Sequence, residues 1–255
     1  MIQQYFSEVA NRYNKLRVTD LEPIGYIAEK IKKLEQIEAI DIGCGSVRYD
    51  ALFYKFLGSK LKLTCADSNF EMLDSLIKYF SSQNISRYTT INAPAENTMY
   101  KDKVFDCVFT FNAVHHFNLL EFLRESARIL KTGGNLFVYT RLPDQNRRNI
   151  WGQHFPMFNQ KETRLYSLNK FVKTVRLVPQ LRLKSIEYYR YERKSALQDL
   201  VHRTRAHHYS TFVLYSLEEL EKAIIGFISN IKNNFKDEAN IHWVDENVMF
   251  VISKM

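Results

Sequence analysis

The chain has few cysteines and no long run of apolar residues. Its three cysteines, Cys44, Cys65 and Cys107, are an odd number without the paired spacing of a zinc site, so we expect reduced, partly buried thiols. No stretch approaches the roughly 20 apolar residues that a membrane-spanning helix needs. A signal peptide is also not expected, because its long apolar core is missing from MIQQYFSEVANRYNKLR. We therefore expect a cytoplasmic protein without a membrane span.

The chain also lacks internal repeats and low-complexity segments. Its 255 residues are 45% hydrophobic and 14% aromatic, which is the composition of a globular protein. Disorder is therefore not expected. The length suits one large domain, or one domain that carries a sizeable insertion.

Positive charge is concentrated in one region. Residues 141–205 contain 15 Lys or Arg against 5 Asp or Glu, whereas the rest of the chain contains 21 against 23. Such a region can attract an acidic small molecule, RNA or an anionic membrane surface. It can equally be a solvated basic face, so the charge alone does not identify a partner.

Strand-like and helix-like segments alternate over the first 140 residues. Because each parallel strand connection needs a covering element, this alternation predicts a parallel sheet with helices on both faces. Strands are expected at 37–42, 60–67, 88–92, 104–111 and 135–140, and helices at 21–34, 49–57, 70–80 and 119–130, with a turn at 131–134. Two later strands, at 182–192 and 247–253, complete a doubly wound, Rossmann-like α/β fold with a seven-stranded, mostly parallel sheet.

The segment after the fifth strand differs from the preceding chain in composition and periodicity. Residues 142–180 are aromatic and basic without clean periodicity, which suits an inserted lid. We expect three parts: an α/β core over 1–141, the lid over 142–180, and a C-terminal part over 181–255 that completes the sheet with helices. In that last part, Ser216 and Glu219 form a capping box that opens a helix.

The turn after the first strand is the candidate ligand site. A glycine-rich turn there lets backbone approach a ligand in the crevice outside the carboxyl ends of the strands. In a dinucleotide fingerprint a third glycine would stand at Arg48, and Asp41 beside the turn would repel a pyrophosphate. Asp67 ends the second strand at the spacing where a carboxylate binds ribose hydroxyls. The combination favours an adenosine ligand that carries positive charge.

Five blocks of the chain, in order, resemble class I S-adenosylmethionine-dependent methyltransferases, in the small-molecule branch with the trans-aconitate and quinone-precursor enzymes. The resemblance covers Tyr5 to Tyr139. It rests on YFSEVANRYNKLR, IDIGCGSV, ADSNFEML, APAENTMYKDKVFDCVF and the pair FNAVHHF with RESARILKTGGNLFV. It implies S-adenosylmethionine as the cofactor and methyl transfer as the reaction.

The resemblance also implies roles for individual residues. The methionine moiety would be lined by Asp41, Gly43, Cys44 and Gly45, and the ribose held by Asp67. The adenine would be covered by Met72 and met at its edge by Ala95 and Glu96. The sulfonium region would face Asn112 and Ala113, and the cofactor would be closed from the N-terminal side by Tyr13 and Arg17. Two departures, Val47 at the family's third glycine and Asn14 at its usual aspartate, predict weaker or shifted cofactor binding.

Two histidines are candidate catalytic residues. His115 and His116 follow the fourth strand at the crevice end, and imidazole titrates near neutral pH. Transfer from a sulfonium needs an acceptor held in line, and a base only where the acceptor loses a proton. One histidine is a candidate for that base. Alternatively, the pair caps the following helix or packs under the sheet.

The expected lid carries the candidate acceptor site. Its aromatic and basic residues suit an organic or aromatic acid, with Trp151, Arg147, Arg148 and His154 as the candidate substrate residues. The later histidines, His202, His207 and His208, have no acid or cysteine at ligand spacing, so we expect no metal.

Three functions remain open from the sequence. The first is a methyltransferase acting on a small acidic or aromatic acceptor. The second is an RNA methyltransferase, because the basic region has interleaved aromatic residues that suit phosphate contacts and base stacking. The third is a catalytically silent adenosine-ligand-binding scaffold, motivated by Val47. An NAD oxidoreductase ranks below these because of Arg48 and because Tyr-x-x-x-Lys follows no suitable strand.

Overall fold

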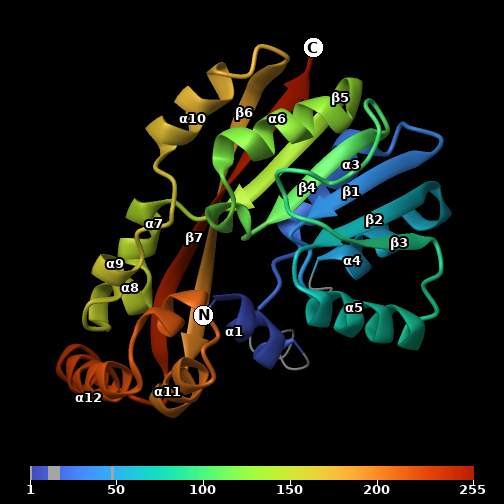
Figure 1. The fold of residues 1–255 in the computed structure, drawn as a ribbon. Coiled ribbons are helices and arrows are strands. Elements are labelled where there is room, and N and C mark those ends of the chain that lie inside the picture. Colours follow the sequence, from blue (N-terminus) through green and yellow to red (C-terminus); the bar gives the residue numbers. More distant parts are fainter. Residues whose placement is uncertain (1, 11–17, 47–48) are drawn as a thin grey trace. The chain divides into compact units, whose positions relative to one another are not determined.

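A seven-stranded mixed sheet organises the protein (Figure 1). The computed structural model describes residues 2–10, 18–46 and 49–255. The strand order across the sheet is β3-β2-β1-β4-β5-β7-β6. In chain order the strands are β1 (Ile37–Ile42), β2 (Leu61–Asp67), β3 (Tyr88–Asn92), β4 (Phe105–Phe111), β5 (Leu130–Thr140), β6 (Leu181–Ser195) and β7 (Ile241–Lys254).

The strand directions confirm the predicted fold. β1 pairs in parallel with both β2 and β4, so the chain order reverses between these two neighbours. β2 is parallel to β3 and β4 to β5, whereas β7 is antiparallel to β5, with Asn135 opposite Ser253. In sheets of this kind, ligands bind outside the carboxyl ends of the strands where the order reverses. That point lies at the ends of β1 and β4.

Helices cover both faces of the sheet (Figure 1). The connections from β1 to β2 and from β2 to β3 run away from the reversal point in one direction, and the connection from β4 to β5 runs in the other. Because such connections are right-handed, α4 and α5 lie on one face of the sheet and α6 on the other. The helices are α1 (Ile2–Val9), α3 (Glu22–Ile31), α4 (Asp50–Leu57), α5 (Phe70–Ser82), α6 (Leu119–Ile129), α7 (Pro143–Arg148), α8 (Ile150–His154), α9 (Phe158–Lys161), α10 (Leu168–Arg176), α11 (Leu197–Arg205) and α12 (Leu217–Asn234). Ser216 and Glu219 form the predicted capping box, since each side chain accepts the other's backbone N–H at 3.1 and 2.8 Å.

The start of β5 differs from the prediction. The KTGG turn expected at 131–134 lies inside this strand, with Gly133 at φ +80°. Phe105 of β4 pairs with Leu130, but Cys107, two residues later, pairs with Asn135. The three extra residues of β5 form a bulge. The turn residues therefore kink a strand that continues on both sides instead of separating it from the helix.

The chain divides into two compact units. The first comprises Met1–Tyr5, Arg141–Ser167 and Tyr188–Asn247; the second comprises Phe6–Thr140, Leu168–Glu187 and Val248–Met255. The residues expected as a lid are shared between them, because α7 to α9 belong to the first unit and α10 to the second. The first unit has an aromatic core around Trp151, Phe212 and Phe227. The core of the second includes the stacked rings of Phe53 and Phe109, whose centroids lie 4.7 Å apart.

Candidate cofactor site in the second unit

The turn after β1 is shaped by two glycines with left-handed backbone. Gly43 has φ +73° and Gly45 has φ +59°, and both conformations favour glycine. A Cβ on Gly43 would lie 2.7 Å from both Ala113 Cβ and Phe117 Cζ, so the turn after β4 approaches this glycine closely. A Cβ on Gly45 would meet no atom of the described residues within 4 Å. The turn is thus packed at Gly43 and open at Gly45, where a ligand can reach the backbone.

The Asp67 carboxylate joins this turn to the end of β2. Its Oδ2 accepts the Gly45 N–H at 2.9 Å, and its Oδ1 accepts the Asn69 N–H at 2.8 Å. Burial raises the pKa of Asp67, while these backbone hydrogen bonds oppose the rise. The Ser68 N–H is a third backbone donor to this carboxylate. A carboxylate has about four acceptor sites, so one remains for a hydroxyl donor. This placement fits the predicted ribose ligand.

Asn69 orients the helix that follows. Its side chain accepts the Met72 N–H at 2.9 Å and so caps the N-terminus of α5. Met72, the residue expected to cover the adenine, is buried on this helix. The D-S-N-F-E pattern contained this cap, but the sequence analysis did not identify it.

Two buried carboxyl groups lie beneath the glycine turn. Asp41 and Asp50 are 1% and 0% exposed, and no described residue donates a hydrogen bond to Asp41 Oδ1 or to either Asp50 oxygen. Burial raises the pKa of Asp50 to about 7, and burial together with Asp50 raises the pKa of Asp41 well above its usual range. The two groups therefore share a proton near neutral pH. The sequence analysis did not identify Asp50 as part of the site. The feature that could have indicated it is an acid directly before the apolar run ALFYKFL.

The turn after β4 contributes the residues expected near the sulfonium. Asn112 has φ +53°, donates its backbone N–H to Tyr139 O at 2.7 Å, and donates its side-chain amide to Tyr49 Oη at 3.3 Å. The Tyr49 ring stacks on Phe111 at 4.3 Å between centroids. The structure therefore brings Asn112 and Ala113 beside the glycine turn, as expected. Tyr49 and Phe117 are additional contacts that the sequence analysis missed.

The two candidate catalytic histidines lie on the next turn. His115 and His116 belong to a short 3-10 helix, Val114–His116, and both are partly exposed. Their ring centroids are 4.1 Å apart, and the Phe6 ring meets His116 edge-on at 5.3 Å. The pair thus follows β4 at the carboxyl edge of the sheet. Its role as a base stays a prediction.

The loop between β3 and β4, residues 93–104, is fixed along α6. Glu96 Oε1 accepts the Asn118 N–H at 2.6 Å, at the N-terminus of α6. Glu125 Oε1 accepts the Thr98 N–H and hydroxyl at 2.7 and 2.6 Å in the middle of the helix. Arg128, near its C-terminus, donates to Tyr100 O at 2.6 Å. Buried Ala95 and half-buried Glu96, expected at the adenine edge, lie on this loop.

Some of the expected residues lie outside the described part of the chain. These are the cofactor candidates Tyr13 and Arg17 and the two positions that depart from the glycine pattern, Val47 and Arg48. Asn14 is also among them. Their predicted contributions stay predictions.

The four candidate substrate residues belong to the first unit. Trp151 is 2% exposed in the aromatic core, where its Nε1 donates to Thr204 Oγ1 at 3.2 Å. Arg147 and Arg148 are exposed and pair with Asp144 and Glu246. The His154 ring packs edge-on against Phe235 at 5.4 Å. The structure thus gives Trp151 a packing role in this core, and the proposed acceptor contacts of all four residues stay predictions.

Other features bear on the expected absences. Cys44, Cys65 and Cys107 are buried free thiols. Across residues 2–10, 18–46 and 49–255, no helix is both long and apolar enough to cross a membrane. The same described ranges contain no group of three His, Cys, Asp or Glu side chains that would hold a metal ion.

Comparison with known proteins agrees with this fold. Residues 40–138 match a family model described as a methyltransferase domain. Sterol 4-C-methyltransferase strm-1 of Caenorhabditis elegans is 30% identical over 142 residues, which cover 54% of this chain and 41% of that protein. The matched segments span about half or less of the curated relatives, between 41% and 51% of their lengths.

Solved structures share the fold over nearly the whole chain. The YcgJ protein of Bacillus subtilis covers 92% of this chain with 99% of its own, at a TM-score of 0.67 and 16% identity. The geranyl diphosphate C-methyltransferase of Streptomyces coelicolor, solved with Mg²⁺, geranyl diphosphate and S-adenosyl-L-homocysteine, covers 91% of this chain with 78% of its own. Its TM-score is 0.55 at 13% identity.

Proposed function

Because this chain carries a domain of the methyltransferase family over residues 40–138, we propose that it transfers a methyl group from S-adenosylmethionine to a small organic acceptor. The observation that carries the proposal is the open glycine turn, with Asp67 bound to the Gly45 N–H at 2.9 Å, at the reversal point of the sheet. A carboxylate there meets the hydroxyls of an adenosine ligand. The buried Asp41 and Asp50 beneath the same turn disfavour an anionic pyrophosphate.

The described residues fit this cofactor at three points. Gly45 offers backbone with open space beside it, Asp67 keeps a free acceptor site, and Asp41 has a buried oxygen to which no described residue donates. We assign the methionine end to the turn with Asp41, Gly43, Cys44 and Gly45, and the adenosine end to Asp67, Met72, Ala95 and Glu96. When bound, S-adenosylmethionine supplies an electrophilic methyl group on a sulfonium.

The protein's part in the transfer is positioning and proton removal. Asn112 and Ala113 line the site beside the glycine turn. Asn112 is fixed in place, because its backbone and its side chain are both hydrogen-bonded. An acceptor that carries a proton must lose it as the new bond to methyl forms. His115 or His116 accepts that proton on a ring nitrogen, and an acceptor without a proton needs neither.

We assign the acceptor to an acidic or aromatic class, on the basic and aromatic content of 142–180. Arg147 and Arg148 are exposed, so their guanidinium groups can exchange Asp144 and Glu246 for a ligand carboxylate. Trp151 lies on the next helix, α8, and His154 lies at the end of that helix.

The RNA alternative loses support from the pairing of the basic region. Of its cations, Arg141 and Arg193 pair with Asp245, Lys161 with Glu219, and Arg205 with Glu221. These acids lie outside 141–205 in sequence but inside the same unit. These three acids therefore offset part of the net charge of the region within the fold, and less of it remains for phosphates.

Calorimetric titration of the full chain with S-adenosylmethionine and S-adenosylhomocysteine, with NAD as the control, tests the cofactor. We expect micromolar binding of the first two alone. No binding, or binding of NAD alone, would overturn the proposal. Binding without turnover on a panel of organic acids, aromatic acids and RNA would instead favour the silent scaffold.

The double variant Arg147→Glu/Arg148→Glu tests the acceptor site. It is expected to preserve S-adenosylhomocysteine affinity while reducing turnover of an acidic acceptor at least tenfold. The variant Lys232→Glu/Lys236→Glu, in the same unit, makes an equal charge change and controls for the general field. Undiminished turnover in the arginine variant would exclude this pair from acceptor binding.

A further inference from the structure

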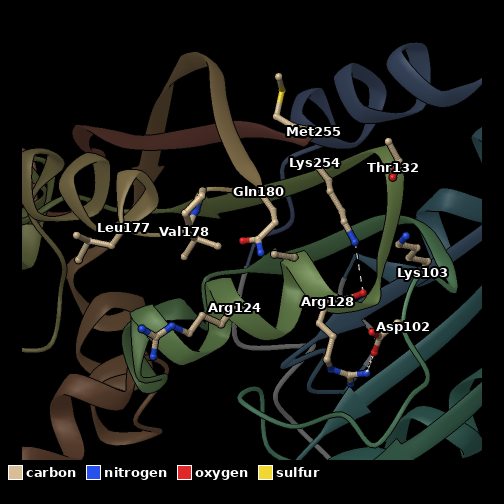
Figure 2. Close-up of a pocket in the computed structure, with 12 residues that line it drawn as sticks. Asp102, Lys103, Arg124, Arg128, Thr132, Leu177, Val178, Gln180, Lys254 and Met255 are labelled. Carbon is tan, nitrogen blue, oxygen red and sulfur yellow. Dashed lines mark hydrogen bonds and ion pairs between the residues drawn. The ribbon is translucent and has the colours of Figure 1, made fainter.

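A pocket of about 650 Å³ lies within the second unit, at the edge of the sheet opposite the glycine turn (Figure 2). Asp102 and Lys103 precede β4, and Thr132 lies near the start of β5. β7 runs antiparallel to β5, so Lys254 near its end reaches the same edge. The full lining is Asp102, Lys103, Arg124, Ala127, Arg128, Thr132, Leu177, Val178, Pro179, Gln180, Lys254 and Met255.

Two of the four cations in this pocket have no carboxylate partner among the described residues. Arg124 pairs with Glu121 at 2.7 Å, and Arg128 pairs with Glu125 and Asp102 at 2.8 Å each. Lys103 is exposed and makes no ion pair with the described part of the chain. Lys254 Nζ donates to the uncharged carbonyl oxygens of Leu130 and Arg128, at 2.6 and 3.5 Å.

Lys254 is the unusual member of this pair. It is only 8% exposed, and buried ammonium groups in proteins are normally paired with an anion. Burial lowers the pKa of Lys254, the positive charge of Lys103 lowers it further, and the negative charge of Asp102 opposes both effects. The effect of Lys103 places the two ammonium groups within electrostatic reach of each other. The Asp102 carboxylate in the same lining is already ion-paired with Arg128. The two neighbouring ammonium groups, which make no ion pair with the described residues, therefore form a site for an anion.

The other end of the pocket carries apolar side chains, beside Arg124, which is ion-paired with Glu121 (Figure 2). Figure 2 shows Leu177 and Val178 at one end, Lys103 and Lys254 toward the other, and the Gln180 carboxamide between them. Leu177 is 63% exposed and Val178 is 2% exposed, so this end presents both a rim and a floor of hydrocarbon. A ligand with an anionic head and a short apolar group would bury both parts.

We propose that this pocket binds an organic phosphate monoester, with its head at Lys103 and Lys254 and its apolar group against Leu177 and Val178. A phosphate monoester carries between one and two negative charges at neutral pH, which matches the two unpaired ammonium groups. Lysine binds phosphate as a point charge and needs no bidentate geometry. The volume lies within the range of small-molecule sites. The proposal is independent of the methyltransferase function.

Hexyl phosphate, titrated calorimetrically into the full chain without S-adenosylmethionine, tests the pocket. We expect saturable one-to-one binding that is at least tenfold tighter than that of inorganic phosphate, because the hexyl group adds apolar burial. Lys103→Glu should weaken hexyl phosphate binding at least tenfold. Lys101→Glu is the matched control, since this exposed lysine lies on the same loop but outside the pocket.

Two further experiments test the apolar contact and the kind of molecule that carries the phosphate. Leu177→Asp should weaken hexyl phosphate but leave inorganic phosphate unchanged. Phosphatidylcholine vesicles that contain phosphatidic acid distinguish two sources of the phosphate. If the natural ligand is a lipid headgroup, the protein binds these vesicles and Lys103→Glu abolishes that binding. If the ligand is a free monoester, the protein does not bind the vesicles. Absence of saturable hexyl phosphate binding, or equal weakening by Lys103→Glu and Lys101→Glu, would overturn the proposal.

Discussion

The two edges of the sheet in the second unit differ in charge and in the groups that line them. At the carboxyl edge, turns with positive φ at Gly43, Gly45 and Asn112 surround the buried acids Asp41 and Asp50. At the amino edge, Lys103 and Lys254 line a pocket made largely of side chains. The comparison teaches that one sheet can carry two sites of different chemistry, because its edges are built from different connections. The following variants test how independent these edges are.

The largest effect is expected at Gly43. Gly43→Ala combines a positive φ with contacts of 2.7 Å, so we expect it to lower the free energy of unfolding by about 3 kcal/mol. Gly45→Ala has the φ penalty alone and should cost about 1 kcal/mol. Urea unfolding measures both. Gly45→Ala should nevertheless reduce S-adenosylhomocysteine affinity at least tenfold, because the added methyl group fills the open side of the turn. Equal losses of stability in Gly43→Ala and Gly45→Ala would contradict this account.

A smaller effect is expected from the buried acid pair, as a dependence of stability on pH. The folded-state pKa of Asp50 is about 7, above its unfolded value, so folding retains a proton that the unfolded chain loses. The stabilising contribution is therefore fully present below about pH 4 and is lost as the pH rises through 7. Asp50→Asn should flatten this decline and raise the free energy of unfolding at pH 8.

Urea unfolding between pH 4 and pH 8 measures this difference. Asp74→Asn, an exposed acid of α5, is the control and should follow the wild-type pH dependence. A slope that is the same in Asp50→Asn and wild type would show that Asp50 does not hold the proton.

The third effect compares two aspartates, one at each edge. Asp67 Oδ2 accepts the Gly45 N–H at 2.9 Å, and Asp106 Oδ2 accepts the Glu38 N–H at the same distance. Asp67→Ala should weaken S-adenosylhomocysteine binding at least tenfold, or about 1.4 kcal/mol. Asp106→Ala should leave that affinity unchanged while losing a similar backbone contact. If calorimetry gives Asp67→Ala and Asp106→Ala the same affinity for S-adenosylhomocysteine, Asp67 does not bind the ribose.

Much of the fold was predictable because its elements show strong periodicity. The strand and helix alternation up to residue 140, the seven strands and the methyltransferase resemblance are confirmed by the structure and the domain match. The helices α7, α8 and α9 were not predicted, since they contain only 6, 5 and 4 residues. Such short elements cannot display an apolar face, and tertiary packing around Trp151 and Phe158 stabilises them.

The candidate site was predictable in position but not in its chemistry. The glycines and Asp67 stand at recognisable spacing from the end of a strand, so their proximity followed from the topology. Asp50 was missed because an acid at the start of a helix is ordinarily exposed and interacts with the helix dipole. Its burial depends on the packing of α4 against the sheet. The catalytic and substrate assignments depend on an acceptor, and they stay predictions.

The attachment of loop 93–104 to α6 has a thermodynamic consequence. The same loop carries Glu96 at one end and Asp102 and Lys103 at the other, and α6 contacts it at Asn118, Glu125 and Arg128. Cofactor and anion would therefore bind to opposite ends of one jointly anchored segment. By linkage, any factor by which an anion changes cofactor affinity must equal the factor by which the cofactor changes anion affinity. Any such coupling between a methyl donor and a phosphate ester would have to act across α6, which is about 16 Å long.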